Sequence, residues 1–213
     1  MPPSVELRGI TKTFGPVRAL VGVSARFEGG RISVIEGANG SGKSTLLSIL
    51  GTLAKPTMGE IDHGSFGKTR AEVRSVLGWV GHETLAYGDL SGRENVALAA
   101  RLRGIDPEGA WQDARDRFDL SSFGDRPVRT YSRGQRQRIA VAKALVHGPS
   151  LVLFDEPTAG LDARSTERLS RVVREESERG AVVILVTHDP SFARVGDMHL
   201  RLERGRVVDS RAG

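Results

Sequence analysis

Residues 37–44 have the types and spacing of a phosphate-binding loop. They read Gly-Ala-Asn-Gly-Ser-Gly-Lys-Ser and fit the pattern G-x-x-x-x-G-K-[ST] at every fixed position. The glycines let backbone N–H groups point at one phosphate, Lys43 can neutralise the β/γ oxygens, and the Ser44 hydroxyl can bind Mg²⁺. A glycine-rich turn with a surface lysine is the alternative, but a strand before the loop and a helix after it favour nucleotide binding. The predicted contacts with a nucleoside triphosphate are Gly37, Asn39, Gly40, Ser41, Gly42, Lys43, Ser44 and Thr45.

Two acidic residues follow a second apolar segment. Residues 151–154 read Leu-Val-Leu-Phe and precede Asp155 and Glu156, as expected of a buried parallel strand that carries acids to the carboxyl edge of its sheet. Asp155 can hold Mg²⁺ through water, and Glu156 can act as the base that polarises an attacking water. A solvated loop start is the alternative when the segment stands alone. The phosphate loop favours the catalytic interpretation.

A further anion site is predicted at the start of a later helix. Ser132 and Gln135 have the S-x-x-Q spacing of a capping box, so a well-capped helix is one interpretation. The other is that this helix N-terminus, with the small hydroxyl of Ser132 and the flexible Gly134, binds a phosphate. One nucleotide does not need two such sites in one subunit.

The elements that must position these residues indicate an α/β fold of the P-loop NTPase (RecA-like) class. The phosphate loop lies between the apolar segments 32–35 and 46–50, and further strands are expected at 76–80, 151–154 and 181–186. Leu169, Val172 and Val173 recur at helical spacing between the last two strands, which predicts a strand-helix-strand unit and a parallel sheet. Alternation in residues 5–8 and 21–27 predicts an N-terminal antiparallel β-subdomain, and residues 199–208 predict a terminal hairpin.

The middle of the chain reads as a helical insert, from about residue 84 to about residue 140, within a single domain that spans residues 1–213. Ser91 and Glu94 form a capping box ahead of one helix, and Asp106-Pro107 begins a second.

Composition limits the function classes. The chain has 213 residues and no cysteine, and its five histidines show no close metal-ligand spacing. Its net charge is +5, but the basic residues are spread along the chain among acidic ones and form no block, which predicts a solvated surface of mixed charge. The longest apolar run, residues 181–186, is too short to cross a bilayer, and no signal peptide is indicated. We therefore expect any membrane role to be exerted through a partner.

Five motifs, in order, make the chain similar to the nucleotide-binding subunits of ABC transporters. Residues 37–44 match the Walker A motif and residues 151–156 match Walker B with its catalytic glutamate. Residues 131–135 resemble the LSGGQ signature, residues 157–162 the D-loop, and residues 186–189 the segment with the switch histidine, His188. The resemblance covers residues 5–208, nearly the whole chain.

The resemblance implies a mechanism and partners. Two such domains sandwich two ATP molecules, each held between one subunit's phosphate loop and the other's Ser132, Gly134 and Gln135. Phe14 stands where an aromatic ring stacks on adenine, although a core phenylalanine is the alternative, and His188 would sense the γ-phosphate. The implied cofactors are ATP and Mg²⁺. The implied partners are a polytopic membrane permease and a second ABC ATPase subunit at the cytoplasmic face of the inner membrane, with no nucleic acid expected.

Two departures from the family pattern stand out. Arg133 replaces the first glycine of the signature, and His82 stands where the family's Q-loop glutamine binds Mg²⁺ or its water. The pair Gly81-His82 is similar to the haem exporter ATPase of cytochrome c maturation and to related exporters. An ABC-type ATPase acting on nucleic acid or in translation is the alternative function, although such relatives usually have coiled-coil arms or paired ATPase domains. A non-hydrolysing regulator is disfavoured by the retained Lys43, Asp155 and Glu156.

Overall fold

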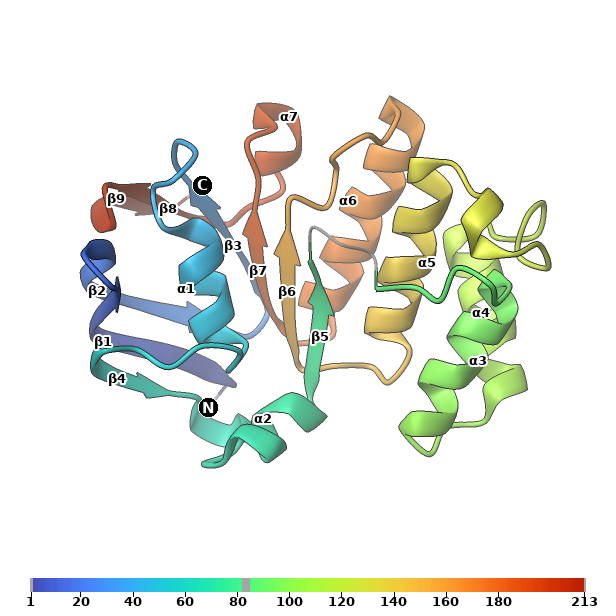
Figure 1. The fold of residues 1–213 in the computed structure, drawn as a ribbon, viewed down its shortest axis with the longest axis horizontal. Coiled ribbons are helices and arrows are strands. Elements are labelled where there is room, and N and C mark those ends of the chain that lie inside the picture. The colour runs from blue at the N-terminus through green and yellow to red at the C-terminus, as the bar shows by residue number, and fades with distance from the viewer. Residues whose placement is uncertain (1, 82–84, 213) are drawn as a thin grey trace.

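A six-stranded sheet, parallel except at one edge, forms the centre of the molecule in the computed structural model, which describes residues 2–81 and 85–212 (Figure 1). Runs of apolar residues form its inner strands because a strand covered on both faces has no solvent side for polar residues. In spatial order the strands are β5 (Leu77–Val80), β6 (Leu151–Asp155), β7 (Val182–Val186), β3 (Arg31–Glu36), β8 (Met198–Glu203) and β9 (Arg206–Ala212).

Side chains of the inner strands alternate between two buried cores. Leu153 and Ile184 lie in the core shared with the first helix and the N-terminal strands, whereas Phe154 and Leu185 lie in the core shared with the later helices. The parallel sheet is thus the middle layer of the molecule, and both of its faces are covered.

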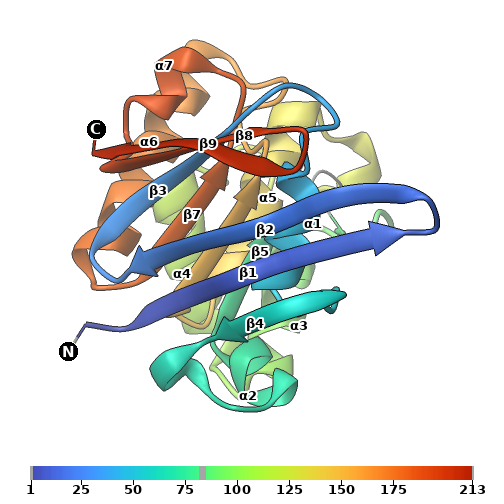
Figure 2. The ribbon, with the colours of Figure 1, turned by 90° about the vertical axis from the view of Figure 1, so that its left-hand side faces the viewer.

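A three-stranded antiparallel sheet covers one side of the molecule, in the order β2-β1-β4 (Figure 2). The predicted pairing of the first two strands is confirmed, since Val5 lies opposite Phe27. The third strand was not predicted. The bounds are β1 (Ser4–Phe14), β2 (Val17–Glu28) and β4 (Met58–Asp62).

The helices begin at residues that can cap them. Ser91 and Asp106 cap the two helices expected between β5 and β6, and Glu94 completes the capping box of the first. Of the helices, the sequence interpretation did not anticipate α2 or the short α7. In the part of the chain described, no helix is long and apolar enough to cross a membrane. The bounds are α1 (Lys43–Leu50), α2 (Arg70–Ser75), α3 (Gly92–Leu102), α4 (Pro107–Phe118), α5 (Arg133–Leu145), α6 (Ala163–Glu178) and α7 (Pro190–Ala193), with 3-10 turns at Gly64–Phe66 and Val128–Thr130.

Strand register brings three of the predicted motifs to one edge of the sheet. Val186, the last residue of β7, pairs with Ile35 of β3 on one side and with Asp155 of β6 on the other. The segments that follow these three strands therefore begin within two strand spacings of each other, about 10 Å. They are the phosphate loop, the segment that starts with Glu156, and the segment that contains His188.

Candidate functional site

The phosphate loop takes a backbone path that its glycines make possible. Gly42, which caps α1, has φ = 107°, and a Cβ at this residue would lie 2.5 Å from the Ala19 carbonyl oxygen and 2.8 Å from Cδ2 of Leu20. Gly37 has φ = 150°, and its Cβ would lie 2.6 Å from Oγ of Ser41. Side chains at these two positions would break the loop's close packing against β2 and against itself.

Lys43 is a buried cation held by the loop itself. Its Nζ donates hydrogen bonds to the carbonyl oxygens of Gly37 (2.8 Å) and Ala38 (3.1 Å), and only 7% of the residue is exposed. Among the residues described, no carboxylate forms an ion pair with Lys43. Because a buried charge normally has a counter-ion, this ammonium group fits a bound phosphate. The buried Oγ of Ser41, in the same loop, has no hydrogen-bond partner among the described residues.

The turn between β8 and β9 braces the phosphate loop from the opposite end of the chain. Gly205 donates its N–H to the Ser41 carbonyl (3.0 Å) and accepts from the N–H of Val21 (2.8 Å). A cavity of about 440 Å³ lies between this turn and the loop, lined by Gly37, Ala38, Asn39, Gly40, Ser41, Arg201, Leu202, Glu203 and Arg204.

Glu156 and His188 meet beside this loop. Nδ1 of His188 lies 2.8 Å from Oε2 of Glu156, and the same oxygen accepts the His188 backbone N–H at 3.2 Å. Glu156 has φ = 51°, a left-handed conformation that costs a non-glycine residue about 1 kcal/mol. Its backbone is held there because its N–H donates to the Val186 carbonyl (2.8 Å). Strain at a reactive position, fixed by the surrounding sheet, fits a catalytic role for this carboxylate.

The residues available for Mg²⁺ are few. Ser44 is exposed in the first turn of α1, Asp155 ends β6, and the described residues contain no group of three or more His, Asp or Glu that could hold a metal ion on their own. Mg²⁺ usually takes one or two protein ligands and fills its octahedron with phosphate oxygens and water. This donor set fits Mg²⁺ that arrives with a nucleotide, and bound there the ion would offset charge on the phosphates.

The predicted signature lies at the start of α5. Ser132 caps the helix, accepting the Gln135 N–H at 3.3 Å, and the Gln135 side chain accepts the Ser132 N–H at 3.0 Å. The capping box is therefore real, and Ser132 is at the same time exposed to solvent. Capping and exposure are compatible with a phosphate arriving from outside the subunit.

Phe14 is not a core residue. It ends β1 with 52% of its surface exposed, and Nζ of Lys12 lies 4.9 Å from the centre of its ring. An exposed ring beside a cation can stack on a base.

His82 falls outside the described residues, so its predicted contact with Mg²⁺ stays a prediction. Hydrogen bonds hold the backbone from Leu85 onward. The backbone of Tyr87 exchanges two hydrogen bonds with the Asn95 side chain (2.9 and 3.0 Å), and Lys143 donates to the Leu85 carbonyl (2.7 Å). Leu85 and Tyr87 are nonetheless 70% and 59% exposed.

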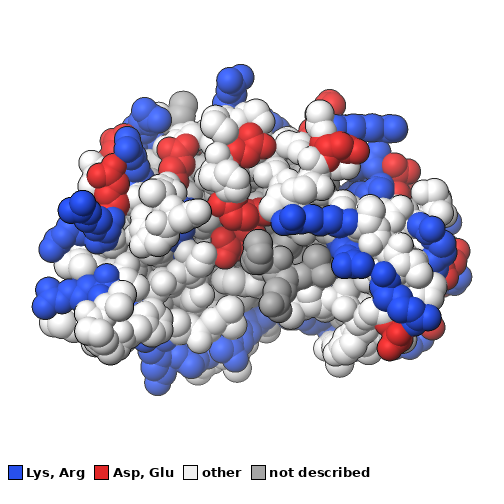
Figure 3. Space-filling view, turned by 45° about the horizontal axis from the view of Figure 1, so that its top comes forward, with Lys and Arg blue, Asp and Glu red and all other residues white. Residues whose placement is uncertain are grey.

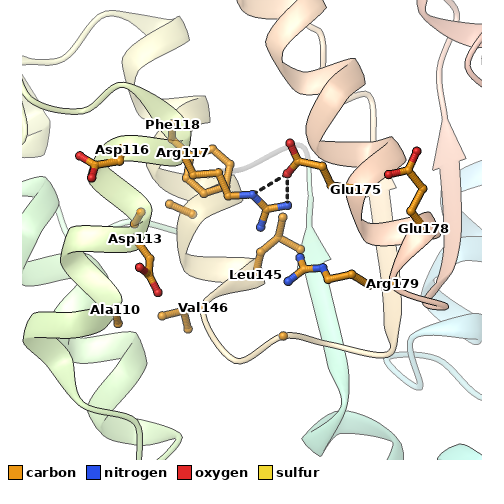
Figure 4. A pocket seen from close by; sticks show the side chains of 13 residues that line it. Ala110, Asp113, Asp116, Arg117, Phe118, Leu145, Val146, Glu175, Glu178 and Arg179 are labelled. Carbon is orange, nitrogen blue, oxygen red and sulfur yellow. Dashed lines mark hydrogen bonds and ion pairs between the residues drawn. The ribbon is translucent and has the colours of Figure 1, made fainter.

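A large cavity, about 730 Å³, lies away from these motifs, between α4, α5 and α6 (Figure 4). On one wall Arg117 of α4 donates to Glu175 of α6 (2.7 and 2.9 Å) and to the buried Glu176 (2.7 Å). Arg179 also pairs with Glu176. These ion pairs fasten α4 to α6, and we assign them a structural role.

Charge on the edge that carries the motifs is mixed, as predicted. Acidic side chains gather near the middle of this face, while Lys and Arg lie mostly toward its margins (Figure 3).

The fold and the site define a P-loop ATPase. A family model described as "ABC transporter" matches residues 20–159. The chain belongs to the ABC transporter family and is its ATPase domain.

Curated relatives carry export names. The chain is 34% identical, over 97% of its length, to the macrolide export ATP-binding/permease protein MacB of Marinobacter nauticus, and 35% identical, over 98%, to that of Nitrosomonas europaea. The chain spans about a third of the length of either relative, 34% in both cases. These relatives support transport and not the nucleic-acid alternative.

Solved structures agree with the fold over nearly the whole chain. A dimeric post-hydrolysis structure of the ATP-binding cassette MJ0796, bound to ADP and Pi, superposes with a TM-score of 0.87 at 30% identity and covers 98% of both chains. Another dimeric structure of MJ0796 gives a TM-score of 0.85 at 28% identity, with the same coverage.

Two parts of this site were missed by sequence reasoning. Gly205 braces the loop, and Gly160 lies against Arg133 of the signature. Both glycines have positive φ (78° and 77°) and lie in turns. The turns were readable from the sequence, but the contacts were not, because they join segments far apart in the chain.

Proposed function

We propose that the chain binds Mg-ATP, pairs with a second ATPase domain around two nucleotides, and powers a membrane permease for export. The observation that carries this proposal is the buried ammonium of Lys43, which has no carboxylate partner among the described residues. Lys43 lies in the loop after β3, and His188, which pairs with Glu156, follows the neighbouring strand β7. The two dimeric MJ0796 structures, one of them bound to ADP and Pi, support both nucleotide binding and the pairing of two ATPase domains.

In the mechanism, each group of this chain has one task. The phosphate loop and Lys43 bind the β- and γ-phosphates, and Ser44 and Asp155 hold Mg²⁺, with His82 as a further proposed ligand. Glu156 orients and deprotonates the attacking water, and His188, held by Glu156, faces the γ-phosphate. Phe14 stacks on the adenine. Ser132, Gly134 and Gln135 complete the site of the opposing subunit.

The permease contact is proposed at the segment after His82. Leu85 and Tyr87 expose apolar surface while their backbones are fixed to Asn95 and Lys143, so a partner can bind them without first ordering them. This contact would hold the domain at the cytoplasmic face of the membrane. The narrower likeness to a haem exporter rests on Gly81-His82 and stays a prediction, since the relatives named above are macrolide exporters.

The proposal is tested by hydrolysis and by partner capture. We expect Mg-dependent release of phosphate from ATP by the purified chain, and copurification of a polytopic membrane protein with the tagged chain from detergent extracts. A Leu85→Ser/Tyr87→Ser variant should keep hydrolysis and lose the membrane protein. A salt-sensitive shift of DNA or RNA without membrane-protein capture would support the alternative function.

A further inference from the structure

The short turn between β6 and α6 links the catalytic carboxylate to a helix. It starts at Glu156, and its backbone folds on itself through hydrogen bonds from the Ala159 N–H to the Glu156 carbonyl (3.2 Å) and from the Leu161 N–H to the Thr158 carbonyl (3.0 Å). Asp162 ends the turn by capping α6, accepting the Ser165 N–H at 2.8 Å. A displacement of this turn would therefore move the Glu156 carboxylate.

The turn rests on the N-terminus of α5 at two adjacent points. A Cβ built at Gly160 would overlap Cδ of Arg133 and lie 2.7 Å from its Nε and 3.2 Å from its Cγ. One residue further on, a Cβ built at Gly134 would lie 3.5 Å from Cδ2 of Leu161. The Arg133 stem thus lies against the bare backbone of Gly160, and Leu161 packs toward Gly134.

The charge of Arg133 has no local explanation. Among the residues described, its guanidinium makes no hydrogen bond or ion pair with any partner. The first turn of α5 also contains no acid, and a cation is disfavoured at a helix N-terminus. What the structure gives Arg133 is a packing contact along its aliphatic stem.

We propose that Arg133 is a positioning residue for hydrolysis: its stem holds the 156–162 turn, and with it Glu156, against the helix that bears Ser132 and Gly134. The departure from the signature pattern would then replace a glycine by a side chain that joins two motifs of one subunit. The inference rests on the proposed role of Glu156. Its effect should fall on turnover and not on ATP binding, because the phosphate loop is not touched.

Three variants of the full chain separate the stem from the charge. Arg133→Ala removes both, Arg133→Met keeps an unbranched stem without charge, and Arg174→Ala makes the same truncation at an exposed arginine of α6. We expect Arg133→Ala to lower kcat about 5- to 20-fold with KM for ATP changed less than about twofold, since small misplacements of a catalytic group slow the reaction without weakening binding. Arg133→Met should restore most of the activity, and Arg174→Ala should match the wild type.

Hydrogen exchange tests the same contact without any turnover. Peptides covering residues 157–162 should exchange faster in Arg133→Ala than in Arg133→Met, while peptides covering the phosphate loop stay unchanged. If the 157–162 peptides of Arg133→Ala exchange faster but kcat is unchanged, the contact is supported and its link to hydrolysis is overturned. An Arg133→Met variant as impaired as Arg133→Ala would overturn the proposal in favour of the charge. The proposal would also be overturned if Arg133→Ala left both hydrogen exchange and kcat unchanged. The same holds if all peptides of Arg133→Ala lost protection from exchange equally, since that would indicate general destabilisation.

Discussion

Lys43 is held in place by the backbone of the phosphate loop. Its hydrogen bonds to the Gly37 and Ala38 carbonyls keep the ammonium buried. A nucleotide would supply the missing negative charge at this position.

We predict that Lys43→Ala lowers affinity for Mg-ATP by about 10- to 100-fold, which corresponds to the loss of a charge-assisted hydrogen bond. Titration with a fluorescent ATP analogue measures the change. Lys68→Ala, at an exposed lysine, is the control and should bind like the wild type. Equal affinities for the two variants would refute the assignment of the loop.

His147 gives a pH-dependent contribution to stability. Burial, and then the positive charge of Arg103, lowers the pKa of His147 to about 4. The unfolded chain takes up this proton below about pH 6.5, so between pH 6.5 and 4 the unfolded state binds more protons than the folded state. Stability therefore falls as pH falls through this window.

A His147→Gln variant removes this titration. We expect its Tm to fall less than that of the wild type between pH 7 and pH 4.5, in thermal denaturation followed by circular dichroism. Parallel curves for the two proteins would show that His147 does not contribute.

At the scale of elements, α4 is fastened to α6 by charges at the margin of the large cavity. Arg117 donates to Glu175 (Figure 4) and also to the buried Glu176. Removing one partner of a buried ion pair leaves a charge that has lost its solvent and part of its compensation.

We predict that Arg117→Met lowers the free energy of unfolding by about 1–3 kcal/mol, the cost of leaving a buried polar group without one of its partners. The loss is no larger because Arg179 remains beside Glu176. Urea denaturation provides the measurement. Arg174→Met removes an exposed arginine of α6, the helix that carries Glu175 and Glu176, and should change stability by less than about 0.5 kcal/mol. If both variants lose the same free energy of unfolding, the ion pairs of Arg117 do not stabilise the fold.

The sequence predicted those elements that have a local signal. The strands at 151–154 and 181–186 are runs of apolar residues between two cores, and the helix starts at Ser91, Asp106 and Ser132 carry capping side chains. β4 escaped prediction because its residues are mostly exposed and do not alternate, so only its pairing with β1 makes it a strand.

At the scale of the whole molecule, the two predicted phosphate-binding segments lie on different elements of the chain. Ser132 lies exposed at the start of α5, whereas the phosphate loop follows β3. Sequence motifs indicated both segments, but contacts between distant segments, such as Arg133 with Gly160, depend on packing that no local pattern records.

We predict that Glu156→Gln binds ATP without hydrolysing it and dimerises in Mg-ATP, because the amide is nearly isosteric but cannot accept the proton. Light scattering with and without Mg-ATP reports the mass. The double variant Lys43→Ala/Glu156→Gln should stay monomeric. A Glu156→Gln variant that hydrolyses ATP at the wild-type rate would remove Glu156 from the catalytic role.

The brace between Gly205 and Ser41 has a consequence for the order of events on the ribosome. The phosphate loop leaves the exit tunnel before the turn that supports it, because Ser41 precedes Gly205 in the chain. A nascent chain therefore cannot present a finished nucleotide pocket while β8 and β9 are still being made. ATP can stabilise only the state that it binds, so it protects the completed domain and gives no help to the N-terminal half during synthesis.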